Sequence, residues 1–166
     1  MAQATLEMAT ELGKRLVAHG WRIGTAESCT GGLLAAAITD VPGSSGWFDE
    51  GLVTYANTSK QRLLAVPAEL LESQGAVSRA VVEAMVAGVC ARGANVAVAT
   101  SGVAGPDGGT PDKPVGTVWI AWQTPRVLRA RCYQFDGDRD SVRRQTVAEA
   151  LQELLAIIGN GGQTTV

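Results

Sequence analysis

Apolar residues recur with the spacing of one helical face in two long segments, one near each end of the chain. In residues 4–20 the apolar stripe stops at Gly20, a residue that suits the left-handed cap of a helix C-terminus. In residues 138–158 a second stripe recurs every three to four residues. Both segments are therefore predicted to be helices that bury one face. The stripes consist of Leu6, Ala9, Leu12, Leu16 and Val17 in the first segment and Val147, Leu151, Leu154 and Ile158 in the second.

Between these two segments, runs rich in β-branched and aromatic residues alternate with helical patterns. The runs predict strands over residues 21–27, 51–56, 94–102, 117–124 and 126–135. The helical patterns predict helices over residues 30–40, 57–66, 67–75 and 79–93, the last of them with Ser78 as its N-cap. A turn at Thr124 and Pro125 is expected to join the last two strands in a hairpin. Arginines alternate along the final strand, which is typical of a strand near a sheet edge.

The alternation of strands and helices decides the fold class. It predicts an α/β protein made of a single three-layer domain, in which a mixed β-sheet carries helices on both faces. At 166 residues the chain has the size of one domain with its own core. The folded part is expected to end at residue 158, because residues 159–166 are a polar, glycine-containing tail that we expect to be flexible.

Charge and composition narrow the classes of partner and the compartment. A net charge of −2 does not favour a nucleic-acid binder, and no apolar run approaches the roughly 20 residues that cross a bilayer, so we expect neither nucleic acid nor a membrane as partner. The three cysteines, Cys29, Cys90 and Cys132, lack the spacing of a zinc site or a disulfide framework. This favours the reducing cytoplasm and predicts no metal. We expect a small-molecule ligand, and homo-oligomerisation stays open.

The stretch TAESCTGG lies between a predicted strand and a predicted helix and places two candidate nucleophiles side by side. In one interpretation Ser28 or Thr30 caps the helix, while Gly31 and Gly32 allow close packing. In the other, N–H groups at the helix start hold a phosphate, or an oxyanion beside a nucleophilic serine. Cys29 is the rival nucleophile, because a helix N-terminus lowers the pKa of a thiol. Adjacent residues of an extended stretch face opposite sides, so only one of the two is expected to face the site.

A nucleophilic serine needs a base, and the sequence directs the search to lysine. His19 ends the first predicted helix, where a cation suits the helix C-terminus but nothing indicates a catalytic role. Lys60, in contrast, stands in the first turn of a predicted helix, where the macrodipole disfavours an ammonium ion. Apolar surroundings would lower its pKa further, and a neutral lysine acts as a general base. The alternative is a solvated lysine on a helix surface.

Two further segments have the composition of a ligand-binding region. The glycine- and proline-rich residues 103–116 are too many for a simple connection and are expected to face the ligand, although they match neither common phosphate-binding loop pattern. The segment GDRDSVRR is either a solvated helix start or a place where Arg139 or Arg143 meets a phosphate.

Five blocks of the sequence have a common interpretation. They are TAESCTGG, PGSSGWFDEGLVTYANTSK, GAVS, SGVAGPDGGTPDKPVGTVW and GDRDSVRRQ. In this order, and over nearly the whole chain, they resemble the CinA C-terminal-domain family, whose stand-alone members include nicotinamide-nucleotide amidohydrolases of the PncC type. The resemblance implies that residues 1–158 are a CinA C-terminal-like amidohydrolase domain. It implies hydrolysis of nicotinamide mononucleotide to nicotinate mononucleotide and ammonia in NAD salvage, through a Ser28–Lys60 dyad with Tyr55 nearby and without metal or cofactor.

The resemblance also suggests roles for residues around this dyad. Tyr55 and Ser45 are expected to orient the lysine or shuttle its proton, and Glu27 to face the cationic pyridinium ring. The oxyanion is expected to meet N–H groups between Thr30 and Gly32, or nearby hydroxyls. The candidates for binding the substrate phosphate are Ser101, Gly102, Gly105, Arg139 and Arg143.

Two other functions compete with this interpretation. The first is a noncatalytic module that binds a nucleotide or a partner, against which the presence of both Ser28 and Lys60 argues. The second is an amidase for a different small amide, because a fold and a dyad do not fix a substrate.

Overall fold

Strands and helices alternate along the chain as the sequence patterns predict. Over residues 2–159, which the computed structural model describes, the chain forms six α-helices, one 3₁₀ helix and five strands. Most of the predicted tail, residues 160–166, lies outside the described residues. The elements are α1 (Ala2–His19), β1 (Ile23–Glu27), α2 (Leu33–Thr39), η1 (Ser44–Gly46), β2 (Phe48–Val53), α3 (Asn57–Leu64), α4 (Ala68–Gln74), α5 (Arg79–Ala91), β3 (Val96–Gly102), β4 (Thr117–Gln123), β5 (Leu128–Gln134) and α6 (Arg139–Ile158).

The five strands form one mixed sheet in the order β2-β1-β3-β4-β5. β1 pairs in parallel with both β2 and β3, whereas β4 is antiparallel to β3 and β5. Glu27, the last residue of β1, lies opposite Val53 of β2 and Thr100 of β3. The carboxyl ends of these three strands therefore meet at one end of the sheet.

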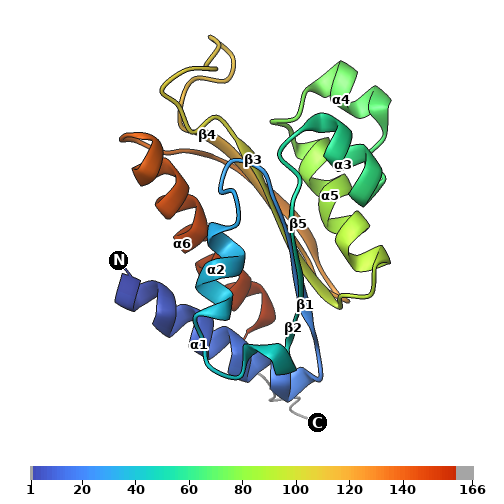
Figure 1. The fold of residues 1–166 in the computed structure, drawn as a ribbon, viewed down its shortest axis with the longest axis vertical. Helices are drawn as coiled ribbons and strands as arrows, with labels where there is room; N and C mark the ends of the chain where they lie inside the picture. Colours follow the sequence, from blue (N-terminus) through green and yellow to red (C-terminus); the bar gives the residue numbers. More distant parts are fainter. Residues whose placement is uncertain (1, 160–166) are drawn as a thin grey trace.

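Helices cover both faces of the sheet, as predicted. Figure 1 shows α1, α2 and α6 on one face and α3, α4 and α5 on the other. β5 lies at an edge of the sheet, and the predicted hairpin before it is present, with the Thr124 N–H donating to the Val127 carbonyl. Ser78 caps α5 by accepting from the Val81 N–H, which confirms the predicted N-cap.

The second strand differs from the prediction. It was expected over residues 51–56, but β2 spans Phe48–Val53. The start of β2 contains Asp49 and Glu50, whose low strand propensity kept them out of the predicted strand. On this edge strand both carboxylates are partly exposed and pair with arginines, Asp49 with Arg22 and Glu50 with Arg92. The earlier end of β2 matters for the site, because it frees the following residues to turn towards α3.

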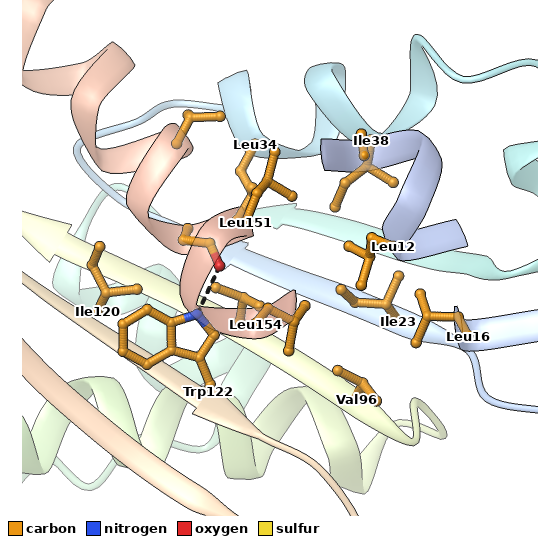
Figure 2. Packing of buried hydrophobic residues seen from close by; sticks show 14 of the residues in the cluster. Leu12, Leu16, Ile23, Leu34, Ile38, Val96, Ile120, Trp122, Leu151 and Leu154 are labelled. Carbon is orange, nitrogen blue, oxygen red and sulfur yellow. Dashed lines mark hydrogen bonds between the residues drawn. The ribbon is translucent and has the colours of Figure 1, made fainter. Parts of the chain in front are cut away.

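Each face of the sheet has its own core, and successive residues of the central strands enter different cores. Ile23 and Val96 pack with α1, α2 and α6, while Ala26 and Ala97 pack with α5. Figure 2 shows the larger of the two cores, where the buried Trp122 indole N–H donates to the Ala150 carbonyl at 2.9 Å. Such two-sided burial explains why β3 is apolar along most of its length. Within residues 2–159, no helix combines the length and apolar character needed to cross a bilayer.

Candidate active site

The candidate site lies where the three parallel strands end. Open α/β sheets bind ligands outside the carboxyl ends of their strands, because the loops there leave a crevice. Here the turn after β1, the segment after β2 and the loop after β3 surround a pocket of about 260 Å³. The pocket is lined by Ser28, Cys29, Tyr55, Gly102, Val103, Ala104, Gly105, Asp107, Gly108 and Arg139.

Glu27 fixes the turn that carries the candidate nucleophile. Its side chain is 1% exposed, and its two carboxylate oxygens accept hydrogen bonds from the backbone N–H groups of Gly32, Leu34 and Ala35 at 2.8–3.1 Å. These are donors at the start of α2 that have no partner inside the helix, and a carboxylate suits the positive end of the helix. Because this carboxylate is enclosed by the helix start, Glu27 does not face the pyridinium ring as expected; it holds the turn.

The turn itself uses the backbone freedom of glycine. Gly31 and Gly32 have φ angles of 59° and 100°, in the left-handed region that side chains rarely adopt. Two further contacts brace the turn from the α6 side: the Arg143 guanidinium donates to the carbonyls of Cys29 and Thr30, both at 3.1 Å. The Arg143 side chain is thus engaged by the turn, which is a positioning role and not the expected contact with phosphate.

The Thr30 hydroxyl is turned away from the pocket. It is fully buried and lies 2.8 Å from the Thr100 hydroxyl. Of the neighbouring N–H groups, that of Gly31 donates to the Ser28 carbonyl and that of Gly32 to Glu27. Two of the three N–H groups expected to hold an oxyanion are therefore already engaged inside the turn.

Ser28 and Lys60, far apart in the sequence, come together in the structure. The Lys60 Nζ lies 3.2 Å from the Ser28 Oγ. Strand alternation explains the direction of Ser28: Glu27 points towards α2, so the next residue points to the opposite face, where α3 carries Lys60. The sequence interpretation of a serine beside a lysine at a helix start thus has a direct structural counterpart.

The surroundings of Lys60 favour its neutral form. Its side chain is 1% exposed, and Nζ donates to the backbone carbonyls of Thr54 at 2.8 Å and of Tyr55 at 3.2 Å. None of the ion pairs within residues 2–159 includes Lys60. Burial without a carboxylate partner lowers the pKa of the Lys60 ammonium below its ordinary value, because the charged form loses its hydration.

Cys29 has the opposite character. Its side chain is 5% exposed and packs in the core with α1, α2 and α6. Burial, the largest cause, raises the pKa of the Cys29 thiol to about 12, so the thiol stays protonated at neutral pH. A backbone hydrogen bond and the nearby Arg143 lower this pKa, but not enough to offset the burial. The geometry therefore favours Ser28 over its neighbour as the nucleophile.

Tyr55 and Arg139 form the rim of the pocket. The Arg139 guanidinium donates to the Tyr55 hydroxyl at 3.0 Å and to the Gly105 carbonyl at 2.8 Å. The Tyr55 side chain is 58% exposed, and its contact with Lys60 is through the backbone carbonyl. Arg139 is thus the arginine that reaches the pocket. It connects the segment after β2 to the glycine-rich loop after β3.

Ser45 lies away from the site, Ser101 is buried beside it, and two other residues were missed. Ser45 is in η1, which precedes β2 and so lies at the opposite end of the sheet from Ser28; it does not orient Lys60. Ser101, in β3, is 1% exposed, so it is not placed for a solvent-facing phosphate. Thr54 and Asp107 were not singled out by the sequence, because one contributes a backbone carbonyl and the other is one polar residue of a long loop.

His19 lies where the sequence placed it. It ends α1, before the amino end of β1, and its ring stacks on that of Trp21 with centroids 4.2 Å apart. β1 separates it from Ser28. Within the described part of the chain, no group of three or more histidine, cysteine or acidic side chains is arranged to hold a metal ion.

Comparison with known proteins identifies close relatives over almost the whole chain. The sequence profile of the CinA C-terminal domain matches residues 5–158. The chain is 58% identical to the nicotinamide-nucleotide amidohydrolase PncC of Pseudomonas putida over 90% of its own length and 94% of that protein. It is 50% identical to the protein of the same name from Escherichia coli K12, covering 90% and 92%.

Solved structures with the same fold are also related in sequence. The competence damage-inducible protein A (ComA) of Klebsiella pneumoniae superposes with a TM-score of 0.90 at 40% identity, covering 95% of this chain and 99% of that one. The competence/damage inducible protein CihA of Agrobacterium tumefaciens superposes with a TM-score of 0.88 at 39% identity, covering 94% and 96%.

Proposed function

The chain belongs to the CinA C-terminal domain family, and from this we propose that Ser28 and Lys60 form the catalytic dyad of an amide hydrolysis. The protein is a hydrolase that acts on the carboxamide of a nicotinamide nucleotide. We propose nicotinamide mononucleotide as its substrate, with nicotinate mononucleotide and ammonia as products, in pyridine-nucleotide salvage. The noncatalytic binding module is not favoured, since relatives 50–58% identical carry the name of an amidohydrolase.

One observation carries the dyad: the three polar contacts of the Lys60 Nζ. Two are with backbone carbonyls, which only accept hydrogen bonds, and the third is with the Ser28 Oγ at 3.2 Å. A neutral amine has two hydrogens and one lone pair. When its hydrogens bond the carbonyls of Thr54 and Tyr55, its lone pair is left for the Ser28 hydroxyl hydrogen. The geometry therefore suits the neutral lysine as a base for this serine.

Acylation follows from that arrangement. Lys60 takes the proton of the Ser28 hydroxyl as Oγ forms a bond to the carboxamide carbon, and the carbonyl oxygen becomes an oxyanion. The carbon–nitrogen bond then breaks, and the Lys60 ammonium returns its proton to the leaving nitrogen, which departs as ammonia. The products of this step are ammonia and an ester between Ser28 and the nicotinate group.

Deacylation repeats the proton transfer with water. A water molecule takes the place of ammonia and gives a proton to Lys60 as its oxygen attacks the ester carbon. When the carbon–oxygen bond to Ser28 breaks, Lys60 protonates the departing Oγ, and the free acid leaves and loses its proton to solvent to become the carboxylate. Both half-reactions need only one base that exchanges a proton with Ser28 and with the leaving or entering group.

The rest of the nucleotide is proposed to lie along the pocket rim. Arg139 is placed to bind the phosphate, because its guanidinium reaches the pocket and Arg–phosphate pairs form strong, charge-assisted hydrogen bonds. Gly102 and Gly105, which also line the pocket, leave room for the backbone to approach the ligand. The pyridinium cation finds a carboxylate in Asp107 of the same pocket, in place of Glu27.

The setting of the enzyme is a further part of the proposal. None of the three cysteines forms a disulfide, which supports a reducing cytoplasm. We also propose that the enzyme works without nucleic acid as a partner, on the ground of its net charge of −2. Homo-oligomerisation stays a prediction that a measurement of molar mass in solution decides.

The decisive experiment follows ammonia release from nicotinamide mononucleotide in the presence of a chelator. We expect one ammonia and one nicotinate mononucleotide per substrate consumed, with unchanged rate when the chelator is added. Nicotinamide riboside and nicotinamide, tested beside it, report how much the phosphate and the ribose contribute. A well-folded protein that releases no ammonia from any of the three would refute the amidohydrolase proposal, and release from another small amide alone would change the substrate.

A further inference from the structure

Ser28 lies between two other hydroxyl residues at the ends of the neighbouring strands. The Ser28 N–H donates to the Thr100 carbonyl of β3, and the Thr54 N–H donates to the Glu27 carbonyl of β1. These bonds continue the parallel ladders one residue beyond the last pairs of β1. Ser28 is thus level with Thr54 on the β2 side and with Ser101 on the β3 side. Neighbouring strands lie about 4.8 Å apart, so the hydroxyl residues form a row across the nucleophile.

Alternation places Ser28 and Ser101 on the same face of the sheet. In β1 and β3, Glu27 and Thr100 direct their side chains towards the turn before α2. Ala26 and Ala99, one residue earlier, pack in the core with α5. Residues two apart in a strand share a face, so Ser28 and Ser101 both point to the α5 side, where Lys60 also lies.

The Ser101 hydroxyl lacks the partner that a buried polar group requires. The residue is 1% exposed, and its Oγ has no hydrogen-bond partner among residues 2–159. An unmade hydrogen bond at a buried hydroxyl costs about 1–3 kcal/mol, so such a group calls for an explanation. Neighbouring positions of β3 hold threonine, alanine and glycine. Packing in the core alone therefore does not explain a serine at this position. The Thr54 hydroxyl, on the other side of Ser28, is also buried and without a partner among residues 2–159, so a ligand atom beside the nucleophile can serve as partner to a hydroxyl on either side.

The position of Lys60 shows which atom of the substrate that is. The carbonyls of Thr54 and Tyr55 hold Nζ on the β2 side of Ser28. The leaving nitrogen has to be on that side, because Lys60 returns a proton to it. The reacting carbon also carries the carbonyl oxygen and the ring carbon, and an orientation with the carbonyl oxygen towards β3 brings it to the free hydroxyl of Ser101.

We infer that Ser101 is a further catalytic residue, whose hydroxyl donates a hydrogen bond to the carbonyl oxygen of the scissile amide as that oxygen becomes an oxyanion. The inference rests on the proposed amide hydrolysis and adds an oxyanion donor to it. It also accounts for the turn, in which the N–H groups of Gly31 and Gly32 are engaged elsewhere. Hydroxyl side chains serve this role beside backbone N–H groups, and they stabilise charge that develops only in the transition state.

The test compares Ser101→Ala with Thr25→Val on the amide substrate. Thr25 is also fully buried in the sheet, and its hydroxyl also lacks a partner among residues 2–159, but it faces α2. Loss of one oxyanion donor lowers kcat by about a hundredfold or more, with little change in KM, and we expect this for Ser101→Ala. Thr25→Val, which removes the same group from the other face, is expected to keep kcat within about threefold, a change below about 0.7 kcal/mol.

A thioamide analogue of the same nucleotide separates an oxyanion donor from a residue that only packs. Sulfur is a weak hydrogen-bond acceptor, so the ratio of wild-type to Ser101→Ala ammonia release is expected to fall from about a hundredfold with the amide to about fivefold with the thioamide. Ser101→Cys, which keeps the shape but has a weak donor, is expected between wild type and alanine. Melting temperatures of all variants check the fold.

The outcomes separate this inference from the function itself. Wild-type turnover with an unaffected Ser101→Ala variant refutes the oxyanion role and leaves the dyad in place. Equal losses with amide and thioamide, or an equal loss in Thr25→Val, refute it as well, because a structural effect does not depend on the substrate atom. An absence of turnover in the wild type refutes the amide hydrolysis on which the inference rests.

Discussion

Glu27 and Lys60 are both buried ionisable side chains next to Ser28, but they lie on opposite faces of the sheet. The Glu27 carboxylate is surrounded by three backbone N–H donors at the start of α2. Lys60 has two carbonyls and a hydroxyl around its Nζ, without an opposite charge. The Glu27 carboxylate lies at the positive end of a helix, whereas the Lys60 ammonium has only neutral acceptors and no opposite charge nearby. The first residue therefore holds structure, while burial lowers the pKa of the second.

The comparison extends to the residues around them. On the Glu27 face, Arg143 and the Thr30–Thr100 contact brace the turn, and every hydroxyl of that pair has a partner. On the Lys60 face, the hydroxyl of Ser101 has none among the described residues. The Thr25 hydroxyl on the α2 face also lacks a partner among the described residues, but it is not level with Ser28, whereas Ser101 is. A satisfied polar network makes a rigid support, and an unsatisfied hydroxyl beside the nucleophile is placed where a ligand can complete it. The two faces of the sheet thus have different roles: residues on the α2 face hold the turn, and residues on the α5 face are placed for the reaction. Glu27 and Ser28, which are adjacent in the chain, point to these opposite faces.

The strongest test of this division replaces the two adjacent candidates for the nucleophile. Ser28→Ala is expected to lower kcat by about 10⁴-fold or more, since no other group can form the acyl intermediate. Cys29→Ala, on the supporting face, is expected to keep kcat within about threefold. Ammonia release under saturating substrate measures both. Activity that survives in Ser28→Ala and disappears in Cys29→Ala would reverse the assignment.

Lys60→Met is expected to lower kcat/KM by about a thousandfold, within the range for loss of a general base. In the wild type, kcat/KM is expected to rise with pH as the Lys60 ammonium, with its lowered pKa, loses its proton, and to level off above that pKa. Lys60→Met should lack this rise. A pH profile from about 5 to 10 measures it, and the same limb in the variant would assign the titration to another group.

The same shift has a consequence for stability. Because the pKa of Lys60 is lowered in the folded state, the unfolded chain binds more protons between that pKa and the ordinary lysine value of about 10.4. The free energy of unfolding is therefore expected to rise with pH across this window, relative to Lys60→Met. Urea titrations of both proteins at several pH values measure the difference. A parallel pH dependence in the two proteins would contradict the lowered pKa.

The fold elements that the sequence predicted correctly are those whose signal is local. Helical periodicity, strand composition and the position of Lys60 in a first turn were enough to predict the fold and to bring serine and lysine together as candidates. The role of Glu27 was missed, because its carboxylate reaches a helix that starts six residues later, beyond the usual N-cap spacing. Ser45 was misplaced, because it belongs to the same sequence block as Lys60. β2 lies between the two residues and carries the chain from one end of the sheet to the other.

A smaller effect is expected when the supporting face is changed. Glu27→Gln removes the charge but keeps one oxygen acceptor, and it is expected to lower the free energy of unfolding by about 2–3 kcal/mol. For a domain of this size, that lowers the melting temperature by about 4–12 °C. Glu83→Gln, the same change in the surface pair with Arg79, is expected to lose less than about 1 kcal/mol. The folded Glu27→Gln protein should keep its KM; a large rise in KM with unchanged stability would place Glu27 in the substrate site.

The smallest effect separates two arginines of α6 that lie four residues apart. Arg139 reaches the pocket, whereas the Arg143 guanidinium is held by the turn carbonyls. Arg139→Ala is expected to raise KM for the mononucleotide by about tenfold, about 1.4 kcal/mol, and to leave the riboside, which has no phosphate, unchanged. Arg143→Ala is expected to affect both substrates equally, because it loosens the nucleophile and touches no phosphate. The ratio of kcat/KM for the two substrates measures this difference: equal ratios in both variants would remove Arg139 from phosphate binding, and a changed ratio in Arg143→Ala would bring the supporting face into substrate recognition.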